Sequence, residues 1–242
     1  MTTLTLAPAN MALADEKAVD QEGAISSAAD ATKTAAFDIL AAHASRDGNQ
    51  VTFRMTTAGV AGAEQPNPVG ALAGAPVFSY VWPTSLDPAT VGFEGGSGIL
   101  ALAATSHPDF DDTPLYDEDG DGDPANDGLI WHSHWVVLTP TEGCGEGALG
   151  VRDIAEGATP TMPATWPGLP IFLDSPGYEP ALDGPEIAVT VPVADGATLA
   201  GTGYDGVTAA LRVNADIHAP LLCVTDVFDV ASGDLSLPGK LQ

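Results

Sequence analysis

Short apolar runs with a two-residue period recur along the chain, and turns rich in Gly, Pro, Asp and Asn separate them. Such alternation is typical of β-strands that bury one face. After residue 36 no apolar pattern has the 3.6-residue period of a helix, and 20 prolines and 27 glycines leave little room for long helices. The strand candidates are residues 76–82, 98–106, 129–139, 169–174, 186–193, 206–217 and 220–230. The pattern predicts an all-β fold, an antiparallel β-sandwich with long Asp/Gly/Pro-rich loops.

The first clear element is a hairpin around the stretch SRDGNQ. An Asp-Gly pair between two runs of alternating apolar residues is a strong signal for a two-residue turn. With Asp47 and Gly48 as the central turn residues, Ala44 faces Val51. This register places His43 on the face of the ribbon away from the apolar side chains. We therefore expect His43 to be exposed or at an edge rather than a buried ligand.

Two segments at the N-terminal end of the chain differ in composition from the strand-rich part. Residues 1–14 are apolar, uncharged and end in Ala-Leu-Ala, which resembles the end of a secretory signal with its cleavage site. Residues 15–35 are small and polar and predict a flexible linker. Residues 36–235 are then expected to form a single β-sandwich domain, because sandwiches often use this length as one unit. The predicted location is periplasmic or extracellular.

The charge of the chain limits its partners. Seven Lys and Arg residues stand against 33 Asp and Glu, a formal net charge of −26, and no Lys or Arg lies between Arg54 and Arg152. Such a surface repels nucleic acids and anionic membrane surfaces, and no segment is long and apolar enough for membrane insertion. Metal ions are the expected partners, and the sequence indicates no particular protein partner. Adaptation to a salty medium is the alternative explanation of the charge.

The two cysteines, Cys144 and Cys223, are expected to form one disulfide. A single bridge that closes a long loop is typical of oxidising compartments and agrees with export. A thiolate metal site would need closer spacing or more cysteines. Two unpaired thiols are the alternative.

Nine acidic residues lie within residues 109–127. Asp117, Asp119 and Asp121 alternate and precede a glycine, as ligands do in the first half of an EF-hand calcium loop. The glutamate that closes such a loop is absent, so a later Asp or Asn would complete the shell. The predicted calcium ligands are Asp117, Asp119, Asp121, Asp123 and Asp127. The alternative is a solvated turn.

A His-x-His pair follows the acidic loop in the stretch LIWHSHWVVL. Alternate side chains of a strand share a face, so His132 and His134 point the same way and can reach one ion. Imidazole pairs of this kind suit copper first and zinc second. His107 ends the preceding strand and is the predicted third ligand, with His218 as the other candidate. The alternative is a pair of packed histidines that bond to carboxylates.

Nucleophilic catalysis has little support in the sequence. No Gly-x-Ser-x-Gly motif occurs, and Ser133 points to the opposite strand face from both neighbouring histidines. We therefore expect a binding protein and not an enzyme.

Two resemblances extend this interpretation. The segment FDILAAHASRDGNQVTFRMTTAG resembles the opening hairpin of exported DOMON-like β-sandwiches. That resemblance implies a sugar ligand or a haem held by a methionine and a histidine, here Met55 with His132 or His134. The acidic loop and the Trp/His cluster are similar to MopE/CorA-type copper-binding surface proteins of methane-oxidising bacteria. Those use histidines and an oxidised tryptophan two residues before one of them, whereas here Trp131 directly precedes His132, so only the histidines carry over.

The sequence therefore predicts an exported metal-binding protein that calcium stabilises. Its His-x-His strand would bind copper or zinc for sequestration or delivery. One alternative is a haem-binding electron-transfer β-sandwich. Another is a carbohydrate-binding or adhesion module. The sugar platforms of that module would be Trp82, Trp131, Trp135 and Trp166.

Overall fold

The protein is described by a computed structural model over residues 18–20, 23–67, 69, 71–108, 117, 122–123, 128–193 and 199–241. Two short 3₁₀ helices, η1 (Pro88–Val91) and η2 (Glu142–Cys144), occur among these residues. The strands are β1 (Ala18–Val19), β2 (Ile25–Ser26), β3 (Ile39–Asp47), β4 (Gln50–Thr57), β5 (Pro76–Pro83), β6 (Ile99–Ser106), β7 (His132–Pro140), β8 (Leu149–Val151), β9 (Leu173–Asp174), β10 (Ala181–Asp183), β11 (Glu186–Pro192), β12 (Gly203–Tyr204), β13 (Val207–Val213), β14 (Leu222–Val230) and β15 (Gly239–Lys240). In the described ranges no helix is long and apolar enough to cross a bilayer.

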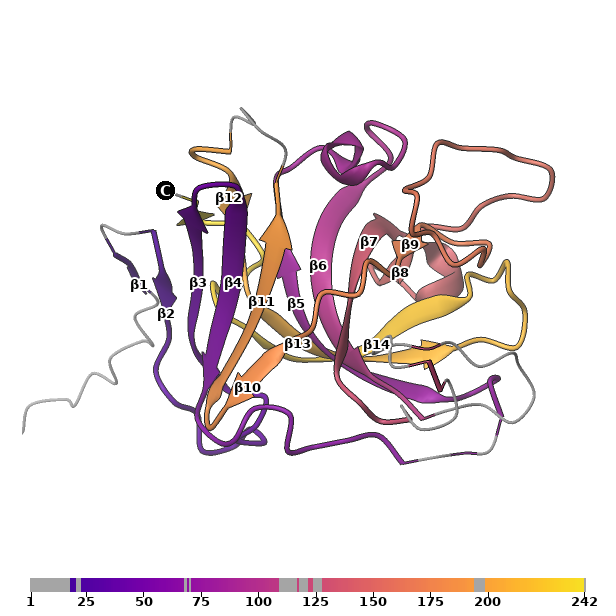
Figure 1. Ribbon diagram of the computed structural model, residues 1–242. Helices are drawn as coiled ribbons and strands as arrows, with labels where there is room; N and C mark the ends of the chain where they lie inside the picture. The colour runs from indigo at the N-terminus through magenta and orange to yellow at the C-terminus, as the bar shows by residue number, and fades with distance from the viewer. Residues whose placement is uncertain are drawn as a thin grey trace, which may run out of the picture.

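Six strands close into a barrel (Figure 1). The order is β6-β5-β13-β14-β8-β7, and β7 pairs again with β6, so the six strands form a ring. All strand pairings are antiparallel, which confirms the predicted all-β antiparallel class. The predicted sandwich differs from this arrangement. One of the two layers is closed, because β7 bonds to both β6 and β8.

A second sheet, in the order β1-β2-β3-β4-β11-β10, lies beside the barrel (Figure 1). The side chains between the two layers form a large aromatic core, which we call the outer core. It joins residues of β3, β4 and β11 to the outward faces of β5, β6 and β7. Within it, Phe53 meets Trp82 and Trp135 at ring-centroid distances of 6.2 Å. Burial of such side chains is the main source of stability in this architecture.

The side chains that point into the barrel are smaller. On β5, Phe78, Tyr80 and Trp82 point into the outer core, whereas Ser79 and Val81 line the barrel. The buried hydrophobic residues of the inner cluster are alanine, valine, leucine and isoleucine, and none of those described is aromatic. The strand wall therefore separates a densely filled layer from a thinly filled interior.

The described part of the segment predicted as a linker, residues 15–35, is attached to the second sheet. β1 pairs with β2, and Ile25 of β2 lies opposite Ala42 and is 1% exposed. Lys33 Nζ also lies 2.9 Å from a carboxylate oxygen of the buried Asp229. These contacts hold the described part of the segment against the second sheet and β14. The predicted signal remnant, residues 1–14, lies outside the described residues.

The turn of the β3–β4 hairpin lies one residue later than predicted, which shifts the pairing of the two strands by two residues. Asp47 pairs with Gln50, and Gly48 takes the first central turn position with φ 57°. Glycine at this position with positive φ is typical of a type II′ turn. Ala44 therefore faces Phe53. A two-residue shift preserves the alternation of faces, so His43 still points away from the outer core.

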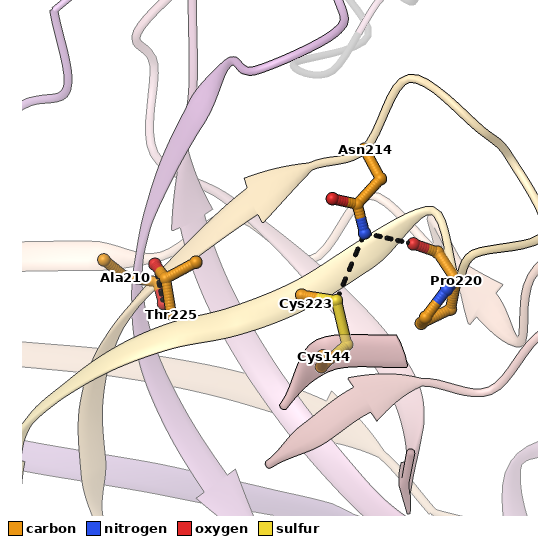
Figure 2. The surroundings of a disulfide bond; sticks show 6 residues. All are labelled: Cys144, Ala210, Asn214, Pro220, Cys223 and Thr225. Atoms are coloured by element: carbon orange, nitrogen blue, oxygen red, sulfur yellow. Dashed lines mark hydrogen bonds between the residues drawn. A yellow bond between two sulfur atoms is a disulfide. The ribbon is translucent and has the colours of Figure 1, made fainter. Parts of the chain in front are cut away.

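The predicted disulfide between Cys144 and Cys223 is present (Figure 2). It lies beside the β8–β14 junction, which has the fewest paired positions of the barrel, because only Cys223 and Gly150 are paired there. Asn214 Nδ2 donates to Pro220 O at 2.6 Å and to Cys223 Sγ at 3.2 Å. A disulfide suggests an oxidising, non-cytosolic environment.

Candidate metal centre

The β6–β7 hairpin brings three histidines together. Thr105 pairs with His132 and Ala103 with His134, and both histidines point into the barrel. His107 follows the last residue of β6 and reaches the same place. The strand period alone explains the shared face of His132 and His134, as the sequence predicted. The antiparallel return of the chain adds His107.

A strained turn fixes the entry into β7. Leu129 has φ 72°, a left-handed conformation that a bulky residue rarely adopts. Its N–H donates to His107 O at 2.9 Å, and its carbonyl accepts from Ser106 Oγ and Gln65 Nε2. These three bonds hold the backbone in its strained form. They also tie the segment of His107 to the start of β7.

The three imidazoles have the geometry of a metal-ligand set. One nitrogen from each of His107, His132 and His134 lies within 4.8 Å of the other two. The ring centroids of His132 lie 4.8 Å from those of both neighbours, and the rings meet edge to face. An ion midway between two nitrogens 4.8 Å apart would lie 2.4 Å from each, so the rings must move closer together to share one ion at metal–nitrogen distances of about 2 Å.

Backbone carbonyls set the tautomer of each ring. The Nδ1 atoms of His107, His132 and His134 lie 3.2, 3.0 and 3.2 Å from backbone carbonyl oxygens. The carbonyl partners are those of Pro108, Ile130 and Asp174, in the same order. A carbonyl can only accept, so each Nδ1 beside one carries the proton and each Nε2 keeps its lone pair. Ser175 Oγ, 3.1 Å from His134 Nδ1, then accepts from the same N–H. Histidine ligands of metals are commonly oriented in this way.

Burial keeps the two strand histidines neutral. Burial, with repulsion from His134 and His107, lowers the pKa of His132 well below 6.5. Burial first and His107 second lower the pKa of His134 to about 4. Metals bind the neutral form of imidazole, so the site is already in its binding state at neutral pH. Thr105 Oγ1 lies 3.2 Å from His132 Nε2, the nitrogen that would face the metal.

The predicted calcium site remains untested. Asp117 and Asp123 are both exposed, and Asp117 Oδ2 accepts from Gly122 N at 2.9 Å. Asp119, Asp121 and Asp127 lie outside the described residues.

Other candidate ligands lie elsewhere. His218 is exposed and pairs with Asp153 at 2.9 Å, so it does not join the cluster. Met55 is fully buried in the outer core, across the strand wall from His132 and His134. The Met55–His pair that the DOMON-like resemblance implied for haem is therefore not brought together. Met55 packs against the outer side of the barrel wall, where its Cε would lie 3.2 Å from a Cβ at Gly206, whereas the histidines line the inner side.

The tryptophans predicted as sugar platforms are mostly structural. Trp82, Trp131 and Trp135 are buried in the outer core. The indole N–H groups of Trp82 and Trp131 donate to backbone carbonyls, those of Arg54 and Gly62. Buried rings of this kind cannot stack on a sugar, and Trp166 alone among the four is exposed.

The histidine cluster opens into a cavity that the sequence did not predict. A partly open cavity of about 800 Å³ extends from the barrel interior, and its wall includes His107, His132 and His134. The rest of the wall is mainly alanine, valine and leucine. A metal bound by three histidines here would therefore have an open coordination position toward an apolar space.

Comparisons with known proteins give no indication of the function. No family model, curated protein or solved structure matches the chain. The resemblances to DOMON-like sandwiches and to copper-binding surface proteins therefore stay expectations.

Proposed function

We propose that the chain is an exported metal-binding protein whose His107, His132 and His134 hold one transition-metal ion. The observation that supports this most directly is that one nitrogen from each imidazole lies within 4.8 Å of the other two, while each Nδ1 bonds to a backbone carbonyl and leaves its Nε2 lone pair as the ligand. His132 Nε2 lies 3.2 Å from Thr105 Oγ1, a contact that a bound metal would replace.

Copper is the first candidate and zinc the second. A neutral three-nitrogen set suits both ions, and copper binds such donors more tightly at equal availability. The disulfide fits a periplasmic or extracellular location, where the protein would sequester the ion or deliver it. Calcium bound by the acidic loop would restrain the segment between His107 and His132. The role is binding rather than catalysis.

The test is metal content. The natively purified protein is analysed for copper, zinc and calcium before and after chelation, and the chelated protein is then titrated with copper. We expect one equivalent of copper in the wild type and its loss in His132→Ala/His134→Ala. His218→Ala is the matched control, because this histidine is exposed and distant from the cluster, and it should retain the full equivalent. Unchanged stoichiometry in the double variant would overturn the proposal.

Electron paramagnetic resonance of the copper-loaded protein identifies the ligands. Three imidazole nitrogens should give resolved nitrogen couplings, and His107→Ala should reduce their number by one. Competition with zinc then ranks the two metals. Preferential retention of zinc would reverse the order of the metals without removing the site.

A further inference from the structure

The barrel is wider inside than its side chains require. Eight-stranded barrels have an interior that side chains just fill, and a six-stranded barrel is narrower. Here the inward positions hold small residues such as Ser79, Ala103 and Ala209, and about 800 Å³ remains. Protein interiors contain few voids larger than a water molecule, whereas small-molecule sites occupy roughly 300–1,000 Å³. The cavity therefore has the size of a binding site.

The cavity has an entrance along β14. β8 is three residues long, and it pairs with β14 only at Cys223, so among the residues that the structure describes no strand covers the later part of β14 on that side. Thr225, Asp226 and Val227 are exposed and also line the cavity. We call these three residues the mouth. A ligand can enter there without any opening of the barrel.

The charge of the wall selects among ligands. Of the described lining residues, none is lysine or arginine, and Asp117 and Asp226 are exposed acids on the wall. A bound carboxylate or phosphate would find no counter-charge in an apolar space, which is costly. The net charge of −26 disfavours anions further.

We propose that the barrel cavity binds a neutral, largely apolar molecule with one hydroxyl group, such as a long-chain alcohol. Valine, leucine and alanine side chains surround its chain. The hydroxyl donates to a histidine Nε2, since each Nδ1 proton already has a carbonyl partner. This binding does not need the metal, so it stands apart from the proposed metal function.

The test uses metal-free protein in EDTA at pH 8 and the neutral fluorescent probe N-phenyl-1-naphthylamine. We expect saturable binding that 1-dodecanol displaces at least ten times more effectively than dodecanoate. Ala209→Phe places a ring inside the barrel and should weaken probe binding at least tenfold. Ala158→Phe adds the same ring at an exposed position and should leave binding unchanged. Equal displacement by both chains, or wild-type binding by folded Ala209→Phe, would refute the proposal.

An exposed substitution covers the case in which Ala209→Phe does not fold. Asp226→Lys exchanges the charge at the mouth and should raise the relative affinity for dodecanoate at least threefold. An unchanged ratio of the two affinities would count against entry past Asp226. His132→Ala/His134→Ala separates this proposal from the metal function, because it should lose copper and still bind the probe. Absence of copper binding in the wild type leaves the probe test intact.

Discussion

The disulfide lies at the point where the barrel is held by the fewest backbone bonds. β8 and β14 meet at one paired position, so Cys144–Cys223 is the main link across this seam. The perturbation is Cys144→Ala/Cys223→Ser. The serine keeps an oxygen near Asn214 Nδ2, which donates to Cys223 Sγ in the native protein. The substitution therefore removes the covalent link with little change in local bonding.

The loss of stability follows from the length of the closed loop. The two cysteines are 79 residues apart. The chain-entropy relation for a loop of this length gives about 4.5 kcal/mol at 25 °C. The total stability of ordinary domains is about 5–15 kcal/mol. Removal of the link should therefore cancel a large part of the stability.

Urea unfolding followed by tryptophan fluorescence measures this loss. With a slope of about 3 kcal/mol per M, the midpoint should fall by about 1.5 M. The wild type in a phosphine reductant is the control and should unfold at the midpoint of the double variant. A shift below about 0.3 M would refute the reasoning, because it would mean that noncovalent contacts hold β14 in place with almost no contribution from the disulfide.

Three further predictions concern the histidine site and its surroundings. In EDTA, the free energy of unfolding should fall as the pH drops below 6.5, because unfolded His134 takes up a proton there and folded His134 does so only near pH 4. The loss from this one residue is about 2 kcal/mol at pH 5. Urea titrations of His134→Gln should therefore show a smaller loss of stability between pH 8 and pH 5 than the wild type. Thr105→Val removes the hydroxyl that bonds to His132 Nε2, so copper no longer has to displace that bond. The copper affinity, measured by competition, should therefore rise several-fold, by about 1 kcal/mol. A lower affinity would mean that the hydroxyl stabilises the copper-bound protein. Burial raises the pKa of Asp174, and one of its side-chain oxygens has no hydrogen-bond partner among the described residues. Asp174→Asn should therefore raise the free energy of unfolding at pH 8, and by less as the pH falls toward 3.8, where the wild-type carboxyl is protonated in the folded state. An equal increase at pH 8 and near pH 3.8, measured by urea unfolding, would contradict this cause.

Local periodicity was enough to predict the long strands and the histidine cluster, whereas the short strands β1, β2, β8, β10, β12 and β15 were not predicted. The alternation in LIWHSHWVVL places His132 and His134 on one face, and a hairpin between neighbouring strands brings His107 back to them. These relations involve short stretches of chain. The same reasoning misjudged the β3–β4 turn, because Asp-Gly and Gly-Asn both fit a two-residue loop.

Barrel closure could not be read from the strand pattern, because it depends on long-range pairings such as Cys223 with Gly150. Both faces of β7 are apolar, which indicates a central strand but not what each face meets. A signal for the hollow interior does exist in the sequence. β5 alternates large Phe78, Tyr80 and Trp82 with smaller Ser79 and Val81, and the smaller set faces the cavity.

Main-chain groups help to orient all three imidazoles, and Ser175 Oγ is an additional side-chain partner of His134 Nδ1. Pro108, Ile130 and Asp174 each contribute a carbonyl oxygen, and every amino acid carries the same oxygen at that place. Mutation at these positions exchanges side chains without deleting the acceptors. Ring orientation is therefore inherited with the course of the backbone, so it can persist through extensive sequence drift as long as the fold itself survives.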